Sequence, residues 1–262
     1  MSVITEIRGI PPLNKLSAAI ITKNEEKNIT DCLKSIAFAD EIVVIDSGST
    51  DKTVEIARDF GCRVFVEEWK GDGPQKNSAI DKCSHEWVLI VDADERVPWE
   101  TKDEIRRLID KSNSADAYSF PRKNYFHGRW IKHCGWWPDR IIRLVKKSKG
   151  RYKSITHGIW SANGAPAKTH VPIEHYSFSC YSDMLKIMED RSSDMAKELF
   201  EAGKSVYIST PFFHGISMFV KIFLLKLGFL DGLDGFVIAA TRAGGSFLKY
   251  AKLLELQRKK KD

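Results

Sequence analysis

The sequence predicts an α/β fold, in which a doubly wound, mostly parallel sheet gains an antiparallel extension and is followed by a helical C-terminal region. Four short apolar segments recur at similar spacing near the N-terminus, and segments with helical periodicity lie between them. After residue 115 this alternation stops. Alternating strands and helices form parallel sheets, whose ligands bind beyond the carboxyl ends of the strands.

The four apolar segments are rich in Val and Ile and bounded by polar residues, as buried parallel strands are. They are SAAIIT (17–22), EIVVID (41–46), CRVFVE (62–67) and WVLIVD (87–92). The first intervening helix places Ile29, Cys32, Leu33 and Ile36 on one face. The second, TVEIARDFG, is expected to turn Ala57 and Phe60 inward and to stop at Gly61. NSAIDKCS predicts a shorter helix before the fourth strand.

The remaining elements follow in chain order. WETKDEIRRLIDK predicts a helix with Pro98 at its start and Ile105, Leu108 and Ile109 inward. Residues 116–180 contain short strand-like pieces rich in aromatic residues, which is typical of an antiparallel extension. From Tyr181 helices return, and the expected core stripe is Met184, Ile187, Met188, Met195 and Leu199. We therefore predict an N-terminal extension (1–15), an α/β domain (16–180) and a helical region (181–262).

The composition is that of an ordinary globular protein, with 43 % hydrophobic and 29 % charged residues among 262. The five cysteines are widely spread and form no CxxC pair. This pattern argues against a disulfide framework or a zinc site and favours a reducing, cytoplasmic setting. The first residues have neither the basic start nor the apolar core of a signal peptide, so we expect no secretion signal.

The net charge of +6 comes from the C-terminal part of the chain. Residues 203–262 contain ten Lys or Arg and four Asp or Glu, so the first 202 residues are neutral. Residues 211–230 approach the length of a membrane span, but Lys221 and Lys226 interrupt them, and a mid-bilayer lysine costs roughly 3 kcal/mol. This region is typical of an amphipathic element on an anionic membrane surface, and a plain helical subdomain is the alternative.

Acidic side chains follow the fourth apolar segment directly. Asp92 and Asp94 stand one residue apart, and Glu95 comes next. A buried carboxylate needs a cation or a donor that offsets its desolvation. Two carboxylates at i and i+2 can both reach one hard divalent cation, which keeps sites for phosphate and water. The motif therefore predicts Mg²⁺ or Mn²⁺, held by Asp92 and Asp94 and carrying a diphosphate.

Two further motifs end the first and second strands. In TKNEE (22–26), the simplest interpretation is a helix cap at Asn24 with acids in the first turn. In IDSGSTDKT (45–53), Asp46 ends a strand and a Gly/Ser turn opens the next helix. Asp46 could accept a hydrogen bond from a ribose hydroxyl or a base N–H, and a purely structural turn is the alternative. The region contains no GxGxxG, which argues against a dinucleotide fold.

Five motifs, in this order and spacing, carry a resemblance to a known family. They are TKNEE, IDSGSTDKT, GPQKNSAI, VLIVDADE and GWWPDRIIRL. Together they resemble family 2 glycosyltransferases with the GT-A fold, in particular the bacterial lipopolysaccharide core glycosyltransferases of the β-glucosyltransferase type. The likeness runs from about Leu16 to GFLDGLDGF near residue 236.

The resemblance implies a GT-A catalytic domain and an inverting transfer of a sugar from a nucleoside diphosphate donor to an acceptor hydroxyl. Such a reaction needs a cation for the departing diphosphate, a base for the acceptor's proton and a pocket that aligns both substrates. The implied donor-binding residues are Thr22, Asn24, Glu25, Asp46, Ser47, Gln75, Lys76, Asn77 and Asp92. Many relatives have two acids where this chain has Asp46 and Ser47, which leaves the nucleobase open.

The catalytic base is expected at Asp139 in GWWPDR. Trp136 and Trp137 precede it and supply an apolar surface on which the acceptor sugar can stack. Such a surface also raises the proton affinity of a nearby carboxylate toward that of a base. An ion pair of Asp139 with Arg140 or Arg143 is the alternative.

Two residues add to the candidate site. Glu95 is the competing base. His157, in SITHGIW, matches the histidine that relatives place near the metal, but Gly158 stands where they have an acid. His157 is therefore either a third metal ligand or a structural histidine, and the sequence leaves both roles open.

Other functions share parts of this pattern. A phosphohydrolase of the haloacid dehalogenase type also has a DxD motif at the end of a strand, but its motif has Thr or Val at the position where this chain has Arg96. A non-catalytic membrane-binding module leaves the strand-end acids without a role, and the neutral first 202 residues argue against nucleic-acid binding. We predict a cytoplasmic enzyme that is peripheral on the inner face of the cytoplasmic membrane. It is expected to extend a lipid-linked glycan, and our hypothesis is that this glycan is the lipopolysaccharide core.

Overall fold

The computed structural model describes residues 14–153, 159–162, 164–178 and 180–259. Backbone contacts divide them into two compact units. Unit 1 holds the described residues up to Phe120 together with Ile141–Pro172, and unit 2 holds Pro121–Arg140 and the described residues from Ile173 onward. The domain boundaries expected after residues 15 and 180 remain a prediction.

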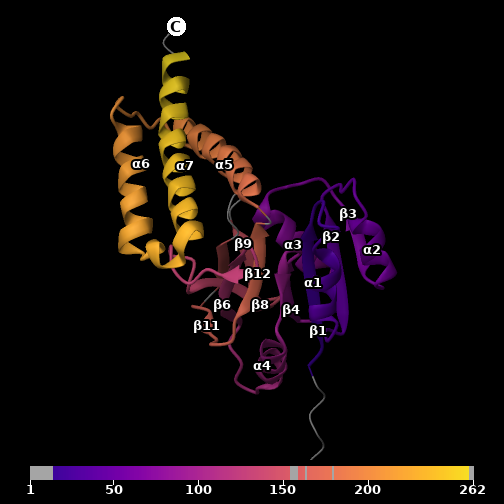
Figure 1. The fold of residues 1–262 in the computed structure, drawn as a ribbon. Helices are drawn as coiled ribbons and strands as arrows, with labels where there is room; N and C mark the ends of the chain where they lie inside the picture. Colours follow the sequence, from indigo (N-terminus) through magenta and orange to yellow (C-terminus); the bar gives the residue numbers. More distant parts are fainter. Residues whose placement is uncertain (1–13, 154–158, 163, 179, 260–262) are drawn as a thin grey trace, which may run out of the picture. The chain divides into compact units, whose positions relative to one another are not determined.

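Unit 1 is built on a parallel sheet (Figure 1). Strand β1 (Leu16–Thr22) lies between β2 (Glu41–Asp46) and β4 (Trp87–Asp92), and β3 (Arg63–Val66) pairs with β2. Consecutive residues in the middle of β1, β2 and β4 are buried, which means that both faces of this part of the sheet are covered, whereas no residue of the edge strand β3 is fully buried. The predicted strands at 41–46 and 87–92 are confirmed to the residue.

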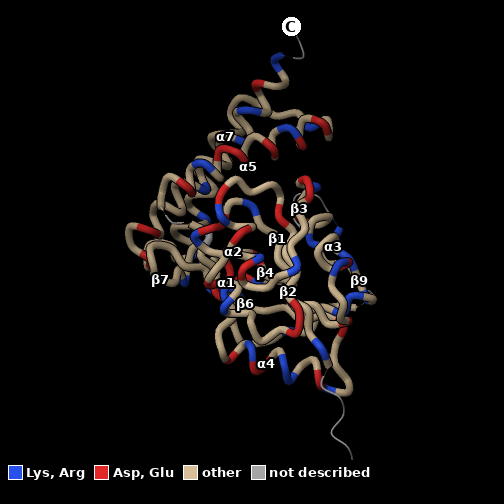
Figure 2. The backbone as a smooth tube through the Cα atoms, turned by 90° about the vertical axis from the view of Figure 1, so that its right-hand side faces the viewer, with Lys and Arg blue, Asp and Glu red and all other residues tan. Residues whose placement is uncertain are grey.

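Helices follow the strands, as the alternation predicts. They are α1 (Ile29–Ile36), α2 (Thr53–Asp59), α3 (Asp72–Lys82) and α4 (Trp99–Asp110). The four apolar residues expected on the inner face of α1 are fully buried. Helix α4 carries acidic and basic residues along its length (Figure 2), while Ile105 and Ile109 are buried as predicted.

Two helical predictions are wrong in detail. Phe60 lies just beyond α2 and is exposed, whereas Ala57 is buried as expected. Helix α3 begins at Asp72 rather than at Asn77. The stretch that precedes Asn77 has the Gly and Pro of a turn, but a proline in the first helical turn loses no hydrogen bond, so the helix includes Pro74.

The sheet continues beyond β4 in the antiparallel direction, as expected. Strand β8 (Asp139–Lys146) pairs with β4, and Val145 lies opposite Val88. A separate antiparallel pair, β9 (Gly150–Lys153) with β10 (Ile159–Ala162), packs on the core of unit 1. The short strands β5 (Glu95–Arg96) and β11 (Ala167–Lys168) complete the unit.

Unit 2 combines strands with helices. The strand β6 (Ala117–Phe126) belongs to unit 2 from Pro121 onward, and this part pairs antiparallel with β7 (Arg129–Trp130) and parallel with β12 (Ile173–Phe178). The extension of the sheet therefore combines the expected antiparallel pairs with parallel ones. The core of this part of unit 2 contains Phe126, Ile131, Cys134, Met184, Ile222, Ile238 and Ala239.

The helices of unit 2 are α5 (Tyr181–Glu201), α6 (Thr210–Val220) and α7 (Gly232–Lys259), with a π-helical turn η1 (Lys221–Leu225) and a 3₁₀ turn η2 (Gly228–Asp231). Helices α6 and α7 lie side by side (Figure 1). Met184 is buried as predicted, but Met195 is exposed, because Ser192 and Ala196 take the inner positions of α5. No helix in the described part of the chain is both long and apolar enough to cross a membrane.

Candidate active site

The carboxyl ends of β1, β2 and β4 bring two of the predicted acids to one edge of the sheet. In the β1–β2 register Thr22 lies opposite Asp46, and in the β1–β4 register Ile21 lies opposite Asp92. Both acids therefore flank the last residues of β1. Strands of a sheet lie about 4.8 Å apart, so the two backbone positions are on the order of 10 Å from each other.

Asp46 uses both carboxylate oxygens to build the turn that follows it. Its Oδ1 accepts hydrogen bonds from the backbone N–H groups of Gly48 and Ser49, at 2.9 and 2.8 Å, and its Oδ2 accepts from the Ser49 hydroxyl. Gly48 has a φ of +82°, a conformation that glycine adopts without strain. The structural turn that the sequence left open is therefore present, and Asp46 is its fully buried anchor.

Asn24 joins the loop after β1 to this same turn. Its backbone N–H donates to the Ser49 hydroxyl at 2.7 Å, and its side-chain Oδ1 accepts from the Thr50 N–H at 2.8 Å. Helix α1 begins only at Ile29, so the interpretation of Asn24 as its cap is wrong. Asn24 instead clamps two loops that form the rim of the sheet.

Glu25 is held beside Asn24 in a partly buried position. Its backbone N–H donates to the Thr53 hydroxyl at 2.8 Å, and its Oε2 accepts from the Asn28 amide at 2.8 Å. Burial raises the pKa of Glu25, the Asn28 hydrogen bond opposes that rise, and the nearby carboxylate of Asp94 adds to it. Glu25 therefore lies within electrostatic range of the second acid of the DxD motif.

Thr22 carries an unsatisfied group at the end of β1. The residue is 6 % exposed, and its Oγ1 is buried without a hydrogen-bond partner among the described residues. A buried hydroxyl that lacks a partner costs about 1–3 kcal/mol. Such a group at a ligand-binding edge is suited to a hydrogen bond with a ligand.

Asp92 and Glu95 share a buried arginine that the sequence analysis did not identify. The Arg143 guanidinium contacts Asp92 Oδ2 and donates to both oxygens of Glu95, at 2.8 and 2.7 Å. Glu95 is fully buried, and its Oε2 also accepts from the Asp92 N–H at 3.2 Å. Arg143 is thus the cation that offsets the acids at the end of the buried strand.

The two acids in turn favour the charged state of Arg143. Burial alone lowers the pKa of its guanidinium, but the carboxylates of Asp92 and Glu95 outweigh that effect and raise it well above its usual value. One signal in the sequence could have identified this residue. Arg143 interrupts the apolar run RIIRLV, and an arginine inside a buried strand requires acidic partners.

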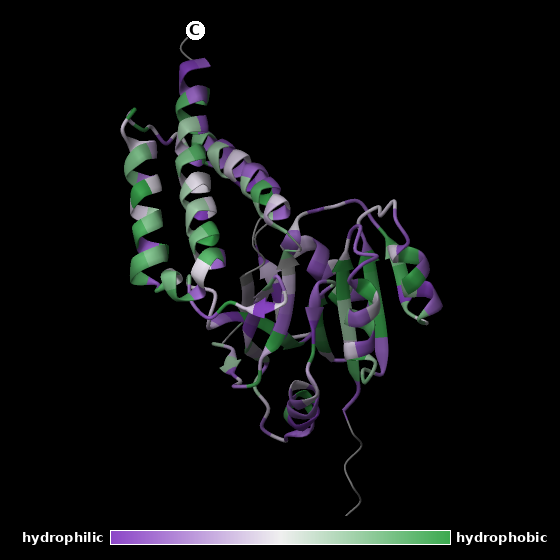
Figure 3. Cartoon of the chain, viewed as in Figure 1, coloured by the Kyte–Doolittle hydropathy of each residue, from purple (hydrophilic) through white to green (hydrophobic). Residues whose placement is uncertain are grey.

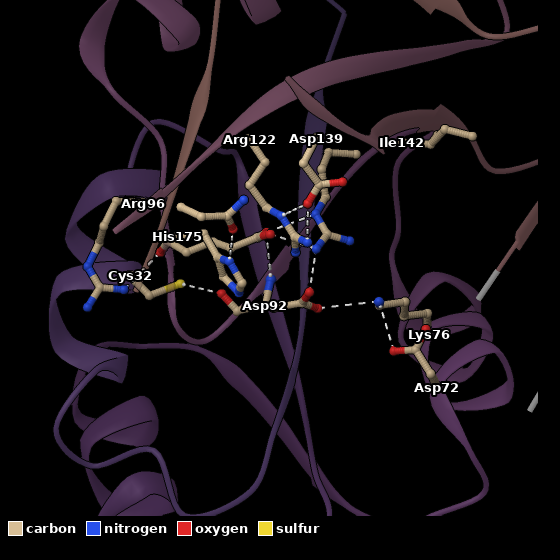
Figure 4. Close-up of polar contacts among 12 residues, drawn as sticks. Cys32, Asp72, Lys76, Asp92, Arg96, Arg122, Asp139, Ile142 and His175 are labelled. Carbon is tan, nitrogen blue, oxygen red and sulfur yellow. Dashed lines mark hydrogen bonds and ion pairs between the residues drawn. The ribbon is translucent and has the colours of Figure 1, made fainter. Parts of the chain in front are cut away.

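Lys76 approaches Asp92 from the other side. Its Nζ lies 2.9 Å from Asp72 Oδ1 and 3.5 Å from Asp92 Oδ1, and these contacts are drawn in Figure 4. The side chain is 8 % exposed, so its position is defined by these two carboxylates. The first acid of the DxD motif therefore faces two cations from this chain.

The neighbours of Lys76 make structural contacts. Gln75 is fully buried and donates to the Ser47 hydroxyl at 3.2 Å, which joins α3 to the turn after β2. Asn77 donates to the Tyr152 carbonyl at 2.8 Å and accepts from the Tyr152 N–H at 2.9 Å. Its amide is therefore engaged with β9 rather than turned to the rim.

The predicted metal ligands are only partly described. Among the residues that the structure describes, no group of three or more His, Cys, Asp or Glu gathers closely enough to hold a metal ion. Asp92 is in the ion pairs above, and Asp94 is partly buried two residues beyond it. His157 lies outside the described residues.

The candidate base lies in unit 2 and has its own cation. Arg122 donates to Asp139 Oδ2 through Nε at 3.0 Å and through Nη2 at 2.5 Å (Figure 4). The sequence suggested Arg140 or Arg143 as the partner of Asp139, but Arg143 instead donates to Glu95 in unit 1. In the described part of the chain Asp139 Oδ1 makes no hydrogen bond.

The two tryptophans before Asp139 have different surroundings. Trp137 meets Trp130 edge to face, with 5.0 Å between ring centroids. Trp136 stacks on Phe178 at 6.0 Å and packs against the core of unit 2. Both rings are partly exposed.

Comparison with known proteins identifies the family. Residues 17–168, more than half of the chain, match the model described as Glycosyl transferase family 2. The chain belongs to this family. The match covers the strand-end acids of unit 1, so the glycosyltransferase has the GT-A fold that the resemblance implied, and the phosphohydrolase alternative is excluded.

Similar proteins agree with this assignment. An uncharacterized glycosyltransferase of Rickettsia typhi is 32 % identical over 95 % of this chain and 90 % of its own length. The lipopolysaccharide core biosynthesis glycosyltransferase LpsC of Rhizobium meliloti is 30 % identical over 94 % of both chains. The crystal structure of S. aureus TarS 1-349 aligns over 94 % of this chain and 91 % of that chain, with 18 % identity and a TM-score of 0.44, a likeness too weak to add to the assignment.

Proposed function

We propose that this glycosyltransferase moves a sugar from a nucleoside diphosphate donor to a hydroxyl of a lipid-linked saccharide, in one displacement that inverts the anomeric centre. The observation that carries the proposal is the pairing of β1 with β2 and β4, which sets Asp46 and Asp92 on either side of the last two residues of β1. This edge is where a doubly wound sheet binds its ligand. The donor is therefore assigned to unit 1.

Thr22 and Lys76 are the donor contacts that the geometry supports best. The buried Thr22 Oγ1 has no partner in the described part of the chain, so a hydroxyl or carbonyl of the nucleoside would satisfy it. Lys76 is held between two carboxylates and carries the kind of point charge that binds a phosphate oxygen. Asp46, Asn24 and Gln75 shape the rim that these two residues face.

A divalent cation fits the chemistry of the DxD residues. Asp92 and Asp94 offer hard oxygen ligands, which Mg²⁺ and Mn²⁺ prefer; Asp92 stands at the rim assigned to the donor, and Asp94 lies near Glu25 of the loop after β1. When bound, such an ion would offset the negative charge of the departing diphosphate. His157 remains a predicted third ligand.

Asp139 is the proposed base. Arg122 fixes its Oδ2 and leaves Oδ1 to accept the proton of the acceptor hydroxyl. As the acceptor oxygen forms its bond to the anomeric carbon, the bond from that carbon to the diphosphate oxygen breaks, and the nucleoside diphosphate leaves with the electron pair. Attack from the face opposite the leaving group inverts the anomeric centre.

Glu95 is disfavoured as the base because all its carboxylate contacts are internal. It is fully buried, both of its oxygens accept hydrogen bonds from Arg143, and one also accepts from the Asp92 N–H. A base must present an oxygen to the substrate. Glu95 instead positions Arg143 and the first acid of the DxD motif.

The acceptor is proposed from similarity and from the aromatic surface of unit 2. LpsC, which shares 30 % identity over 94 % of the chain, is named for lipopolysaccharide core biosynthesis. Trp137, packed edge to face on Trp130, offers a ring on which a sugar can stack. A lipopolysaccharide core saccharide is therefore the acceptor that we expect.

The cytoplasmic side of the membrane is the proposed location. Each of the five cysteines is a free thiol, two of them in the core of unit 1 and one in the core of unit 2. Free thiols persist in a reducing compartment. The location would be tested by fractionating cells, where recovery with the soluble periplasmic proteins would contradict it.

The experiment that tests the activity is a nucleotide-release assay. The purified protein should release nucleoside diphosphate from a nucleotide sugar only with Mn²⁺ or Mg²⁺, and Asp94→Ala should reduce the rate at least about a hundredfold. Asp59→Asn, an exposed carboxylate at the end of α2, is the control and should leave the rate unchanged. Equal rates in chelator and in metal would contradict the metal role, and no release from a panel of nucleotide sugars would contradict the activity.

The acceptor is tested by following the sugar. A labelled sugar should enter an organic-extractable, lipid-linked product when core lipopolysaccharide is supplied. Equal transfer to a free oligosaccharide without lipid would contradict the lipid-linked part of the proposal while leaving the glycosyl transfer intact.

A further inference from the structure

Unit 2 exposes a continuous apolar segment, Tyr207–Phe236. Most of the large apolar side chains that the structure leaves exposed lie in this segment. Figure 3 shows that α6 is largely hydrophobic along its length. Phe213 is 71 % exposed, Leu225 76 % and Leu233 70 %. A soluble monomer rarely exposes more than a few hundred Å² of contiguous apolar surface, and larger patches mark a binding site.

Helix α6 is apolar on both of its faces. Its inner face holds Pro211, and Gly215 approaches Phe247 of α7 so closely that an added Cβ would lie 3.2 Å from the Phe247 Cβ. Its outer face carries Phe213, Ile216 and Val220, which are all exposed. Phe212 is also exposed, but its ring meets Phe247 of α7 edge to face. The helix contains no Asp, Glu, Lys or Arg. A helix with apolar residues on both sides is normally covered on both, and here the outer side is not, although the exposed His214 and Ser217 interrupt the apolar surface.

The turn that joins α6 to α7 is firmly built, so this exposure is not a frayed end. The Cys134 N–H donates to the Lys226 carbonyl at 3.0 Å, and the His133 N–H donates to Asp231 at 2.9 Å. Gly235 packs so closely on the chain that an added Cβ would lie 1.9 Å from the Gly228 carbonyl oxygen. The exposed residues are presented on a fixed platform.

The charges of this segment show which sign its partner carries. Its two acids face inward: Asp231 is 5 % exposed and bonds to His133, while Asp234 pairs with Arg129 at 2.9 Å. Lys221 and Lys226 are exposed. The outward charge of the apolar surface is therefore positive.

From this combination we infer that the outer face of α6, η1, η2 and the start of α7 inserts into the interface of an anionic lipid bilayer. Large aromatic and aliphatic side chains enter the boundary between headgroups and acyl chains, and Lys221 and Lys226 meet the phosphates. None of the described helices can span a bilayer, so the surface lies in the interface. This contact is separate from the chemistry of the rim in unit 1.

Lipid fits this surface better than a protein partner does. Protein interfaces concentrate their binding energy in a few packed anchors inside a polar rim. Here the exposed apolar side chains run along the whole of α6 and around the turn to Phe236, and the exposed lysines are set among them. A membrane accepts such an extended and irregular apolar surface because its acyl chains adapt to it.

The test measures sedimentation with vesicles made of equal parts phosphatidylglycerol and phosphatidylcholine. A triple variant, Phe213→Ser with Leu225→Ser and Leu230→Ser, should lower the partition coefficient at least about tenfold, because binding follows the buried apolar area. The control changes three exposed apolar residues elsewhere, Trp99→Ser with Leu185→Ser and Met195→Ser, and should bind as the unaltered protein does.

Nucleotide release separates this inference from the proposed function. The triple variant should release nucleoside diphosphate at the unaltered rate, which also shows that it folds. Binding of the variant within twofold of the unaltered protein would overturn the inference, as would a failure of the unaltered protein to bind. A stable dimer in light scattering that the triple variant abolishes would overturn it too, since the face would then join two copies of the chain.

Charge gives an independent readout. Lys221→Gln and Lys226→Gln should each weaken binding to the anionic vesicles roughly fivefold at low salt, and added salt should remove the difference. Binding that is equally tight to pure phosphatidylcholine, with no response to either substitution, would overturn the anionic part of the inference.

Discussion

The two ion pairs that involve the predicted acids have different surroundings. In unit 1, Arg143 is 4 % exposed and bonds to both oxygens of the fully buried Glu95. In unit 2, Arg122 bonds to one oxygen of Asp139, whose side chain is 35 % exposed. A carboxylate whose two oxygens both bond to a buried cation supports the fold, whereas a carboxylate with one oxygen that makes no hydrogen bond among the described residues can accept a proton. Removing the first kind should cost stability, and removing the second should cost activity.

The largest expected effect on stability is that of Arg143→Met. This change leaves the fully buried Glu95 and the partly buried Asp92 without their shared cation, and the loss of one partner of a buried ion pair typically costs about 3–5 kcal/mol of unfolding free energy. Urea unfolding would measure it. Arg151→Met removes an exposed ion pair with Asp81 and should cost less than about 1 kcal/mol. Equal losses of unfolding free energy in the two variants would contradict the claim that the buried ion pair contributes more to stability than the exposed one.

Acid should remove a second internal contribution, which comes from Glu41. Burial raises the pKa of this carboxyl, but hydrogen bonds from Ser17 and Ser84, and then from Arg63, outweigh it and lower the pKa to about 2. A lowered folded-state pKa stabilises the protein above the ordinary value of 4.5, and that stability is lost as the pH falls toward 2. Allowing for solvent screening, it amounts to about 2 kcal/mol at neutral pH.

The Glu41→Gln variant isolates this contribution. Its unfolding free energy should be lower than that of the unaltered protein at pH 7, and the difference should shrink steadily between pH 4.5 and pH 2. A difference that stays constant over this range would show that the carboxylate charge contributes nothing.

A smaller effect is expected where an ion pair positions the base. Arg122→Lys keeps the charge but loses the fixed fork that holds Asp139 Oδ2. The turnover number should fall roughly tenfold while the KM for the donor and the unfolding free energy stay nearly constant. A change confined to the donor KM would argue that Arg122 serves donor binding instead.

The smallest stability effect belongs to Thr22→Val. Because Thr22 Oγ1 has no partner among the described residues, valine should leave the stability unchanged or raise it by up to about 1 kcal/mol. The KM for the donor should increase about tenfold, since the nucleoside loses a hydrogen bond. A destabilised variant with an unaltered KM would make the Thr22 hydroxyl a structural group.

Local patterns predicted the framework of unit 1 well. Strands β2 and β4 have the expected bounds, and the inner face of α1 is buried as its periodicity requires. These features depend on residues close together in the sequence, so the periodicity of apolar residues predicts them. The positions of Asp46 and Asp92 at one edge followed from the same alternation.

The partners of the acids could not be predicted in this way. Arg143 lies 48 residues from Glu95, and Arg122 lies 17 residues from Asp139, so these pairs depend on how strands are brought together. The sequence predicted a membrane-surface element in residues 211–230, but for a related reason it did not show which face of α6 is exposed. Its apolar residues occupy both helical faces, and composition does not tell which face another element covers.

The central claim is that Asp139 takes the acceptor's proton and contributes little else. Its most direct test compares donor affinity with the single-turnover rate of sugar transfer in Asp139→Asn. We expect the donor Kd to stay within about twofold and the transfer rate to fall about a thousandfold, the size of effect that a general base has. A transfer rate within tenfold of the unaltered enzyme would contradict this account.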